Sequence, residues 1–490
     1  MNTHSETTRQ WVHIGSGSFA LLLRVIPWWQ ATALAALALV FNLALLPRVG
    51  GRQLYRPADQ ARGFPLGILL YPLSVLLLTL VFPSRLDIVA AAWGILACGD
   101  GAATLVGRRS RVTAENAENA SFDPSLNSGS SRAPSRDDRL RMSALTVSPS
   151  NHARPAVRRG QLPWNPEKTV AGTMAFVLFG ALAGVALAWW VRPAVSPLPP
   201  LTFTIVAPIV AALVAAFVET IPVRLDDNIS VPCAAGVVLW VGSLIAPPSL
   251  SAARDALVLA LPWAIGVNAV TATLGYLAKS VSVSGAVAGA VVGTIIYVGG
   301  GGGAWALLFA TFLAASITSR LGLKRKVVLG IAEDHGGRRG AGNAVANCGV
   351  AAIAAIVALT TPYTSQALLA LVAALTAGGS DTVASEIGKA WGRSTFLVTT
   401  FSRVKPGTPG AMSLEGTAAG VMSAFALAAV GAAFGLIPTS ATFAVVAGAT
   451  VGALVESALA ATLEGPGILN NDMLNFINTA VAAGFTLAVV

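Results

Sequence analysis

Charged residues are scarce in this sequence, and their scarcity excludes most soluble proteins. They make up 11% of the 490 residues, less than half of the roughly 25% that is typical of soluble domains. Hydrophobic residues reach 54%, and the mean hydropathy is +0.70. This composition predicts an all-α protein that crosses the membrane many times.

Cysteine is also rare, which excludes a disulfide framework. The three cysteines, Cys98, Cys233 and Cys348, lie in apolar stretches without metal-ligand spacing, so we interpret them as small buried hydrophobic residues. The N-terminal stretch lacks the basic start and clean apolar core of a secretory signal. We therefore expect it to be uncleaved and cytoplasmic.

The net charge of +10 comes mainly from loops. Aromatic residues are not interleaved with the basic ones, so we expect no nucleic-acid partner; the charges favour anionic lipid and phosphate instead. If the N-terminus is cytoplasmic, the positive-inside rule is met, because the basic connections all fall on the cytoplasmic face. These connections are Arg48–Arg62, Arg108–Lys168, Lys324–Arg339 and Lys389–Lys405.

About fifteen apolar stretches are candidate membrane spans. Their approximate limits are 13–26, 28–46, 65–82, 86–106, 170–191, 201–221, 231–247, 256–278, 284–298, 303–320, 343–361, 365–380, 413–435, 440–463 and 473–490. Residues 110–160 interrupt the series, because they are rich in Ser, Arg, Asn and Pro and poor in aromatic residues. Such a segment buries too little apolar area to offset its ordering entropy, so we predict a disordered cytoplasmic insertion.

Charged residues near the span ends form two series with the same order. The first series contains Asp100, Arg108, Lys168 before Gly172-Thr173, Glu219, and Asp226-Asp227. The second contains Asp381, Lys389, Lys405 before Gly416-Thr417, Glu456, and Asn470-Asn471-Asp472. One such aspartate can simply cap a helix, but two ordered series predict two tandem, similarly organised helical bundles, residues 1–250 and 251–490.

The residue types in these series suit phosphoryl transfer. Carboxylates hold Mg²⁺ or Mn²⁺, Lys and Arg neutralise phosphate oxygens, and glycines let the backbone approach a phosphate closely. The phosphate-loop sequence G-x-x-x-x-G-K-[ST] does not occur in the chain. We therefore expect a nucleotide site of another type.

Glycines and asparagines in the second half favour structural roles. The run Gly299–Gly303 is expected to form a hairpin on the external face, and the four-residue spacing of Gly285, Gly289 and Gly293 favours close helix packing. Asn343 and Asn347 lie one helical turn apart, where capping, hydrogen bonding between helices and ligand contact all remain open.

The motifs of the N-terminal half resemble those of the phytol kinase and dolichol kinase family, which is related to phosphatidate cytidylyltransferase. The resemblance is carried by "RQWVHIGSG" (9–17), "GDGAATLVGRR" (99–109), "LPWNPEKTVAGT" (162–173) and "VETIPVRLDDNISVP" (218–232). It implies a membrane-embedded kinase that uses CTP to phosphorylate a long-chain prenyl alcohol.

The C-terminal half resembles the phytyl-phosphate kinase family, long described as a domain of unknown function. Its motifs are "VSVSGAVAGAVVGT" (281–294), "AEDHGGRRGAGNAVAN" (332–347), "SDTVASEIGKAWG" (380–392), "KPGTPGAMSLEGT" (405–417) and "LNNDMLNFIN" (469–478). Together, the two resemblances imply that a prenol is converted first to its monophosphate and then to its diphosphate. CTP or another nucleoside triphosphate would be the donor, and Mg²⁺ or Mn²⁺ the cofactor.

For the first step, the resemblance implies that Asp100, Asp226 and Asp227 hold the metal and its nucleotide. Arg108 and Lys168 would contact the triphosphate. Either His13 or Glu219 would accept the proton of the prenol hydroxyl.

For the second step, the implied metal ligands are Asp381, Glu386 and Asp472. The implied phosphate-binding residues are Arg338, Arg339, Lys389 and Lys405. Glu333 and Asp334 are further candidates, although a solvated loop explains them equally well. Asp381, Glu386 and Lys405 are counted as catalytic, as are Asp100 and Lys168 in the first step.

Two other functions fit parts of the sequence. A cytidylyltransferase that makes a CDP-lipid would share much of the chemistry of the first half. A transporter would also combine many spans with an internal repeat, but its charges should lie near the middle of the spans, whereas these lie at span ends.

Overall fold

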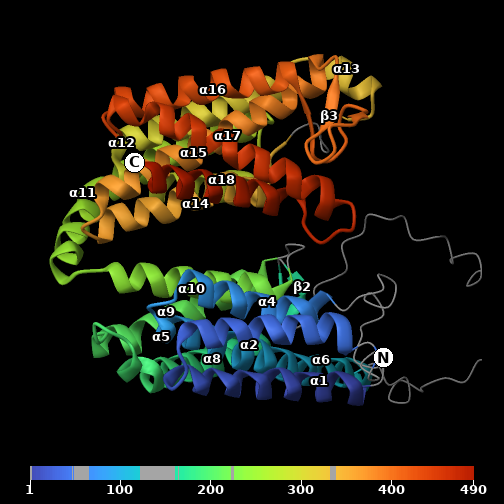
Figure 1. The fold of residues 1–490 in the computed structure, drawn as a ribbon, viewed down its shortest axis with the longest axis vertical. Helices are drawn as coiled ribbons and strands as arrows, with labels where there is room; N and C mark the ends of the chain where they lie inside the picture. The colour runs from blue at the N-terminus through green and yellow to red at the C-terminus, as the bar shows by residue number, and fades with distance from the viewer. Residues whose placement is uncertain are drawn as a thin grey trace, which may run out of the picture. The chain divides into compact units, whose positions relative to one another are not determined.

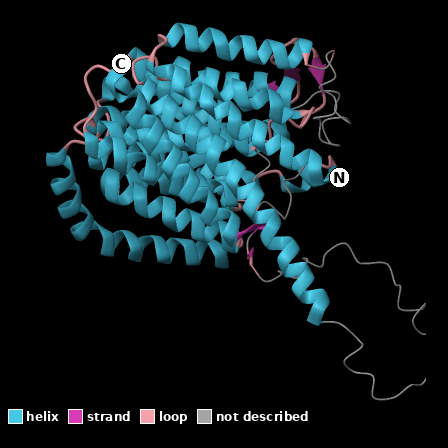
Figure 2. Cartoon of the chain, turned by 90° about the horizontal axis from the view of Figure 1, so that it is seen from below, coloured by secondary structure: helices cyan, strands magenta, loops and turns pink. Residues whose placement is uncertain are grey.

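The computed structural model describes residues 3–46, 48, 66–121, 160–163, 165–221, 226–331 and 338–490. Contacts divide the chain into two compact units, Met1–Ser243 and Leu244–Val490. Both units are built of helices (Figure 1), and strands in the described segments occur only as short pieces beside the helices (Figure 2). Glu333, Asp334 and residues 122–159 of the predicted insertion lie outside the described residues.

The N-terminal unit is centred on one long helical segment and on the helix that packs along it. The segment consists of α5 (Leu86–Gly94), the π-helical η4 (Ile95–Asp100) and α6 (Gly101–Ser121), and α8 (Val170–Val191) lies against all three. The other elements are α1 (Thr3–Ser16), η1 (Gly17–Arg24), α2 (Trp28–Val40), η2 (Phe41–Leu45), α4 (Leu66–Val81), β1 (Gln161–Leu162), β2 (Asn165–Thr169), η6 (Arg192–Ala194), α9 (Leu201–Thr220) and α10 (Asp227–Leu244). Because α6 continues to Ser121, residues 110–121 are helical, and the prediction of disorder is wrong for this part of the insertion.

The C-terminal unit surrounds α15 (Thr364–Trp391), whose residues from Leu369 to Ser380 are all buried. The helices α14 (Ala341–Thr360), α16 (Leu414–Ala433), α17 (Thr442–Leu459) and α18 (Asn471–Val489) pack directly against it. The remaining elements are α11 (Pro247–Leu277), α12 (Val283–Arg320), α13 (Leu323–Val328), β3 (Thr395–Leu397), β4 (Arg403–Val404), β5 (Ala411–Ser413), η8 (Thr439–Ala441) and the π-helical η9 (Ala460–Glu464). The strands form an antiparallel sheet in the order β4-β3-β5.

Twelve of the described helices are long and apolar enough to cross a membrane. The predicted class of a multi-pass helical membrane protein is therefore confirmed, but the count of fifteen is not. Residues 13–26 fall in α1 and η1, and α4 is a shorter apolar helix of 16 residues. The predicted spans 284–298 and 303–320 both belong to α12.

The helix α12 reverses its direction within the glycine run. Gly301 has φ 76° and ψ −178°, which is not helical. Gly285 lies directly against the backbone of Arg339, and the Arg339 guanidinium donates a hydrogen bond of 3.2 Å from Nη2 to Ser319 Oγ. A straight helix would separate residues 285 and 319 by about 50 Å, so the two limbs of α12 must be antiparallel. The two limbs correspond to the two spans that the sequence predicts.

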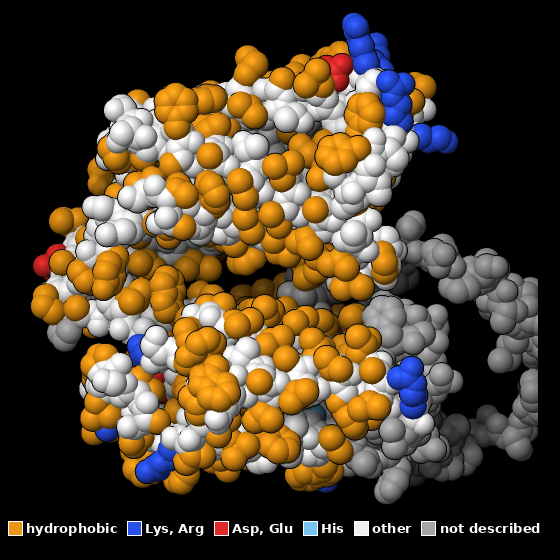
Figure 3. Space-filling view, in the orientation of Figure 1, with side chains coloured by type: hydrophobic (Ala, Val, Ile, Leu, Met, Phe, Trp, Pro, Cys, Tyr) orange, Lys and Arg blue, Asp and Glu red, His pale blue; other side chains and the backbone are white. Residues whose placement is uncertain are grey.

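The surface of the C-terminal unit suits a lipid environment. Large hydrophobic side chains such as Leu259, Trp263 and Leu277 are exposed along α11, and hydrophobic side chains cover the visible sides of the unit (Figure 3). Lys and Arg side chains gather at the end that holds α13 and β3. This distribution of charge at one end of an apolar bundle fits a protein with its polar site at the membrane interface.

We predict that Gly299→Ala destabilises the C-terminal unit, because an added Cβ would meet the backbone carbonyl of Ala355 in α14. Overpacking of this kind costs about 1–3 kcal/mol and exceeds the gain in helix propensity of roughly 0.5–1 kcal/mol. Gly289→Ala, on the same helix, is the control, since its Cβ would have nothing within 4 Å. Thermal unfolding in detergent should show a lower Tm for Gly299→Ala alone. Equal Tm values would contradict this packing.

Candidate functional site

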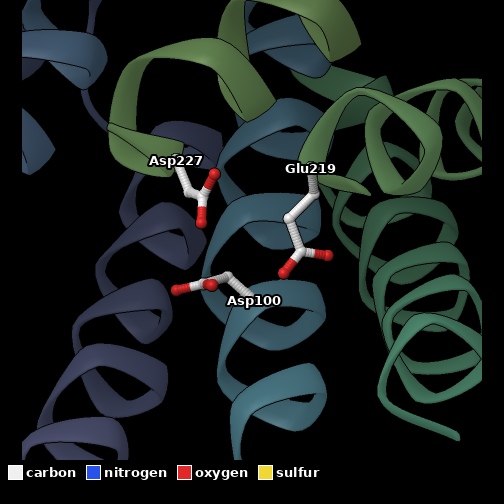
Figure 4. Close-up of side chains that lie close together, drawn as sticks. All are labelled: Asp100, Glu219 and Asp227. Atoms are coloured by element: carbon white, nitrogen blue, oxygen red, sulfur yellow. The ribbon is translucent and has the colours of Figure 1, made fainter. Parts of the chain in front are cut away.

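Three carboxylates from different helices converge in the N-terminal unit. Asp100 ends η4, Glu219 lies in the last turn of α9, and Asp227 begins α10. One oxygen of each lies within 4.8 Å of the other two, and Figure 4 shows the three side chains pointing toward one another. Glu219 is buried, whereas the other two are half-buried. We refer to these three residues and Lys168 as the N-terminal cluster.

Lys168 supplies the positive charge of the N-terminal cluster. Its Nζ lies 2.6 Å from Glu219 Oε1 and 3.0 Å from Asp227 Oδ2. Burial lowers the Lys168 pKa, but Asp227 and Glu219 together raise it by more, so the pKa lies above its usual value. Lys168 therefore remains an ammonium group at neutral pH.

The hairpin of β1 and β2 places Lys168 at the cluster. Asn165 Nδ2 donates a hydrogen bond of 3.1 Å to the carbonyl of Thr220, which ties the hairpin to the end of α9. Thr169 then caps α8, because its Oγ1 accepts a hydrogen bond of 3.1 Å from the Gly172 amide. Lys168 is thus held between two fixed points.

His13 lies on the other side of Asp100. Its Nε2 is 3.5 Å from Asp100 Oδ2 and 3.4 Å from the carbonyl of Leu96, and its ring meets that of Tyr71 edge-on. Burial is the main influence on the His13 pKa and lowers it, although Asp100 opposes this effect. Of the two candidate bases, Glu219 is bound to Lys168, whereas the neighbours of His13 Nε2 are a carboxylate and a carbonyl.

Two predicted members of the first site have other positions. Asp226 is not part of the three-carboxylate group, because its Oδ1 accepts hydrogen bonds from the amide and the side chain of Asn228, at 3.0 and 2.7 Å, at the start of α10. Glu219 takes the position that the sequence assigned to Asp226. Arg108 is half-buried on α6 and has no ion pair with the other described side chains.

The N-terminal cluster fits a small divalent cation. Mg²⁺ binds oxygen ligands at about 2.1 Å, so neighbouring ligands lie roughly 3.0 Å apart and opposite ligands roughly 4.2 Å apart. The three carboxylate oxygens, all within 4.8 Å of one another, are close enough to be drawn together around one ion. Three carboxylates against one ammonium also leave a negative charge for a cation to neutralise. Asp100, Glu219 and Asp227 are therefore the residues that would hold it.

In the C-terminal unit, Glu386 is enclosed by two lysines. Lys326 on α13 is 1% exposed and forms an ion pair with Glu386, which is 3% exposed. Lys389 Nζ lies 3.0 Å from Glu386 Oε1, and Lys326 Nζ also donates a hydrogen bond of 2.8 Å to the carbonyl of Ser319. Glu386 is thus the anion of a buried ion-pair network with Lys326 and Lys389, and its role as a metal ligand stays a prediction.

Lys326 was missed in the sequence. It belongs to the run Lys324-Arg325-Lys326, and three consecutive basic residues are typical of a solvent-exposed loop. All three residues lie in the short helix α13, and only the helical geometry shows that Lys326 faces inward while Arg325 is exposed.

The other residues predicted for the second step do not assemble around Glu386. Asp472, in the first turn of α18, lies against Gly342 at the start of α14. Lys405 and Arg338 are exposed, and Arg339 binds Ser319. Within the described segments, Asp381, Glu386 and Asp472 do not form a group like the three carboxylates of the N-terminal cluster.

The two units nevertheless share one local geometry. Gly172 lies against the carbonyl of Ala103, and Gly416 lies against that of Ala384. Ser413 caps α16 by accepting a 3.1 Å hydrogen bond from the Gly416 amide, just as Thr169 caps α8. Asp100 and Asp381 each precede these alanines by three residues, so they occupy equivalent positions.

This geometry corrects the predicted pairing of Lys168 with Lys405. Lys168 directly precedes Thr169, and the residue that directly precedes Ser413 is Met412. The C-terminal unit therefore has a thioether where the N-terminal unit has an ammonium. Lys405 lies outside this position because the second hairpin contains an additional strand.

A cavity of about 140 Å³ lies among α11, α12, α14 and α15. Its walls are largely apolar, with residues such as Ala286, Val292 and Phe312. Polar residues also belong to the lining, among them Asn268, Arg339, Asn343, Asn347 and Thr382. Thr382 directly follows Asp381 on α15, so part of the polar lining is adjacent to the acidic part of this helix.

Comparison with known proteins identifies the C-terminal unit. Residues 266–483 match the model of the integral membrane protein family DUF92. An uncharacterized membrane protein of Synechocystis is 36% identical over 202 residues, which are 41% of this chain and 78% of that protein. The chain belongs to the DUF92 family.

Two further relatives extend the comparison. The chloroplastic protein VTE6 of Arabidopsis thaliana is 34% identical over 214 residues, which cover 42% of this chain and 64% of VTE6. An uncharacterized membrane protein of Methanocaldococcus jannaschii is 31% identical over 175 residues, 36% of this chain and 71% of that protein. No solved structure matches the chain. Since the family match begins at residue 266, the resemblance of the N-terminal half to prenol kinases stays a prediction.

We predict that Lys326→Met destabilises the protein strongly, because it leaves the buried Glu386 with one lysine instead of two. Loss of one partner from a buried ion pair costs about 3–5 kcal/mol. The double variant Lys326→Met with Glu386→Leu should recover part of this loss, since it removes both charges. The free energy of unfolding in detergent is measured for the wild type, the single variant and the double variant. If Lys326→Met unfolds like the wild type, the Glu386 network does not contribute to stability.

Proposed function

We propose that this chain is a membrane phosphotransferase with one site in each unit. The N-terminal site phosphorylates a long-chain prenol such as phytol to the monophosphate. The C-terminal site phosphorylates the monophosphate to the diphosphate. The donor is CTP or another nucleoside triphosphate, bound with Mg²⁺ or Mn²⁺, and both sites face the cytoplasm. The N-terminal cluster is the observation that carries this proposal.

In the N-terminal site, Lys168 has a double role. An ammonium group has three N–H donors, and two of them are directed at Glu219 and Asp227. The third is available for a phosphate oxygen of the nucleotide. Lys168 therefore holds two carboxylates in position and neutralises charge on the phosphate.

His13 completes the first reaction. It accepts the proton of the prenol hydroxyl, and the oxygen then forms a bond to the terminal phosphorus while the nucleoside diphosphate leaves. Asp100, 3.5 Å from His13 Nε2, stabilises the imidazolium that forms. A divalent cation held by Asp100, Glu219 and Asp227 would neutralise the charge on the phosphate oxygens.

For the C-terminal site, the support is the amphiphilic cavity together with the similarity to VTE6 and the motifs that resemble the phytyl-phosphate kinase family. A prenyl phosphate has an apolar chain and an anionic head. The apolar walls suit the part of the chain next to the head, and Arg339 in the lining suits the phosphate. The head then lies next to Asp381 at the interface.

We predict that the two sites can be silenced separately. Asp100→Asn should abolish phosphorylation of prenol and leave the conversion of monophosphate to diphosphate intact, whereas Asp381→Asn should lower the second kcat by roughly 10² or more and let monophosphate accumulate. The assay is purified protein with γ-labelled CTP and either phytol or phytyl monophosphate. Asp255→Asn, an exposed residue of α11, is the control. Loss of both activities in a folded single variant would contradict the two-site proposal.

A second prediction concerns the cavity. Gly289 lines it, and a Cβ there would have nothing within 4 Å, so Gly289→Leu should fill part of the cavity without a clash. We expect KM for the prenyl monophosphate to rise about tenfold, equivalent to roughly 1.4 kcal/mol, with little change in the prenol reaction. Gly266→Leu, on the exposed face of α11, is the matched control. An unchanged KM would place the prenyl chain elsewhere.

A further inference from the structure

Buried polar atoms without partners meet between α17 and α18. Asn478 is 0% exposed, and neither its amide oxygen nor its amide nitrogen has a hydrogen-bond partner among the described residues. Glu456, on α17, is 9% exposed, and its Oε2 also has no partner there. The Asn478 side chain is the polar group that interacts with the Glu456 carboxyl group, and the charge of Asp381 acts on the same carboxyl group. These three polar side chains come from three helices that pack against one another.

Gly452 allows Asn478 to approach α17 closely. A Cβ at Gly452 would meet both Asn478 Oδ1 and the Asn478 carbonyl. Gly452 lies one helical turn before Glu456 on the same helix. The Asn478 side chain therefore packs against α17 within one turn of Glu456.

Comparison with the N-terminal unit shows that Glu456 lacks the lysine that pairs with Glu219. Glu219 stands at the end of α9, which follows α8, just as Glu456 stands near the end of α17, which follows α16. Lys168 neutralises Glu219, but its equivalent in the C-terminal unit is Met412. Burial of an ionised carboxylate without a partner costs several kcal/mol. A second carboxylate, Asp381, adds to this cost.

We infer that Asp381, Glu456 and Asn478 bind a divalent cation of the Mg²⁺ type. Two carboxylates and one amide oxygen are hard oxygen ligands, which prefer Mg²⁺, Ca²⁺ or Mn²⁺ to softer metals. The cation supplies the positive charge that Lys168 supplies in the N-terminal unit. Its use in holding phosphate oxygens rests on the proposed function, whereas its binding does not.

The experiment measures Mn²⁺ binding to the full-length protein. Protein in detergent is stripped with EDTA and titrated with Mn²⁺, and the electron paramagnetic resonance signal of free Mn²⁺ gives the number and affinity of the sites. We expect Glu456→Gln, which keeps the side-chain shape, to weaken one site about tenfold or more. Asp255→Asn should leave every site unchanged. Equal binding by wild type and Glu456→Gln would overturn the inference.

Met412→Lys provides an independent test. An ammonium group at this position should replace the cation, so one Mn²⁺ site should disappear and the Tm of the metal-free protein should rise. In the wild type, added Mn²⁺ should raise the Tm by mass action, and this increase should be smaller in Met412→Lys. If Met412→Lys keeps the full set of sites, or if Glu456→Gln raises the metal-free Tm without loss of Mn²⁺, Glu456 is a protonated acid and the inference fails.

The binding result is separate from the proposed function. A protein that binds Mn²⁺ at Glu456 but transfers no phosphoryl group would refute the kinase proposal and support the cation site. If the wild type forms prenyl diphosphate and Glu456→Gln binds Mn²⁺ as the wild type does, the kinase proposal is supported and the cation site is refuted.

Discussion

The structure depends on one constraint: a carboxylate buried inside an apolar helical bundle needs a positive charge beside it. In the N-terminal unit Lys168 meets this need for Glu219 and Asp227. In the C-terminal unit Lys326 and Lys389 meet it for Glu386. The helices around these residues are largely apolar. Such charged groups in membrane segments are costly and usually functional.

The same framework carries different charges in the two units. Capping by Thr169 and Ser413 fixes equivalent helix starts, and the glycines that follow allow equivalent close packing. The residue before the cap is Lys168 in one unit and Met412 in the other. A single position on a short hairpin therefore decides whether the hairpin brings an ammonium group to the helix start. This difference suits two sites that act on related substrates of different charge.

Much of the fold could be predicted from the sequence because apolar length and periodicity report directly on membrane helices. Even the two limbs of α12 match the predicted spans on either side of the glycine run. The predicted number of membrane spans was too high where an apolar helix is too short to count as a span, as in α4, or where the stretch forms η1 instead of a long α-helix.

The candidate sites were harder to predict, because spacing along the chain does not fix which way a side chain points. Asp226 turns back to cap α10, whereas Glu219 turns inward. Lys405 matches Lys168 in order along the chain, but the additional strand of the second hairpin displaces it. The importance of Asn478 rests on burial and missing partners, which no motif reveals.

The central claim is that both units transfer phosphoryl groups to a prenyl substrate. Its most direct test is to incubate the purified wild-type protein with phytol and CTP labelled either at the α- or at the γ-phosphate. The account predicts that γ-label alone enters the lipid, first as monophosphate and then as a diphosphate with two labelled phosphates. Lipid that carries α-label would identify a cytidylyltransferase and contradict the account, as would the absence of any labelled lipid.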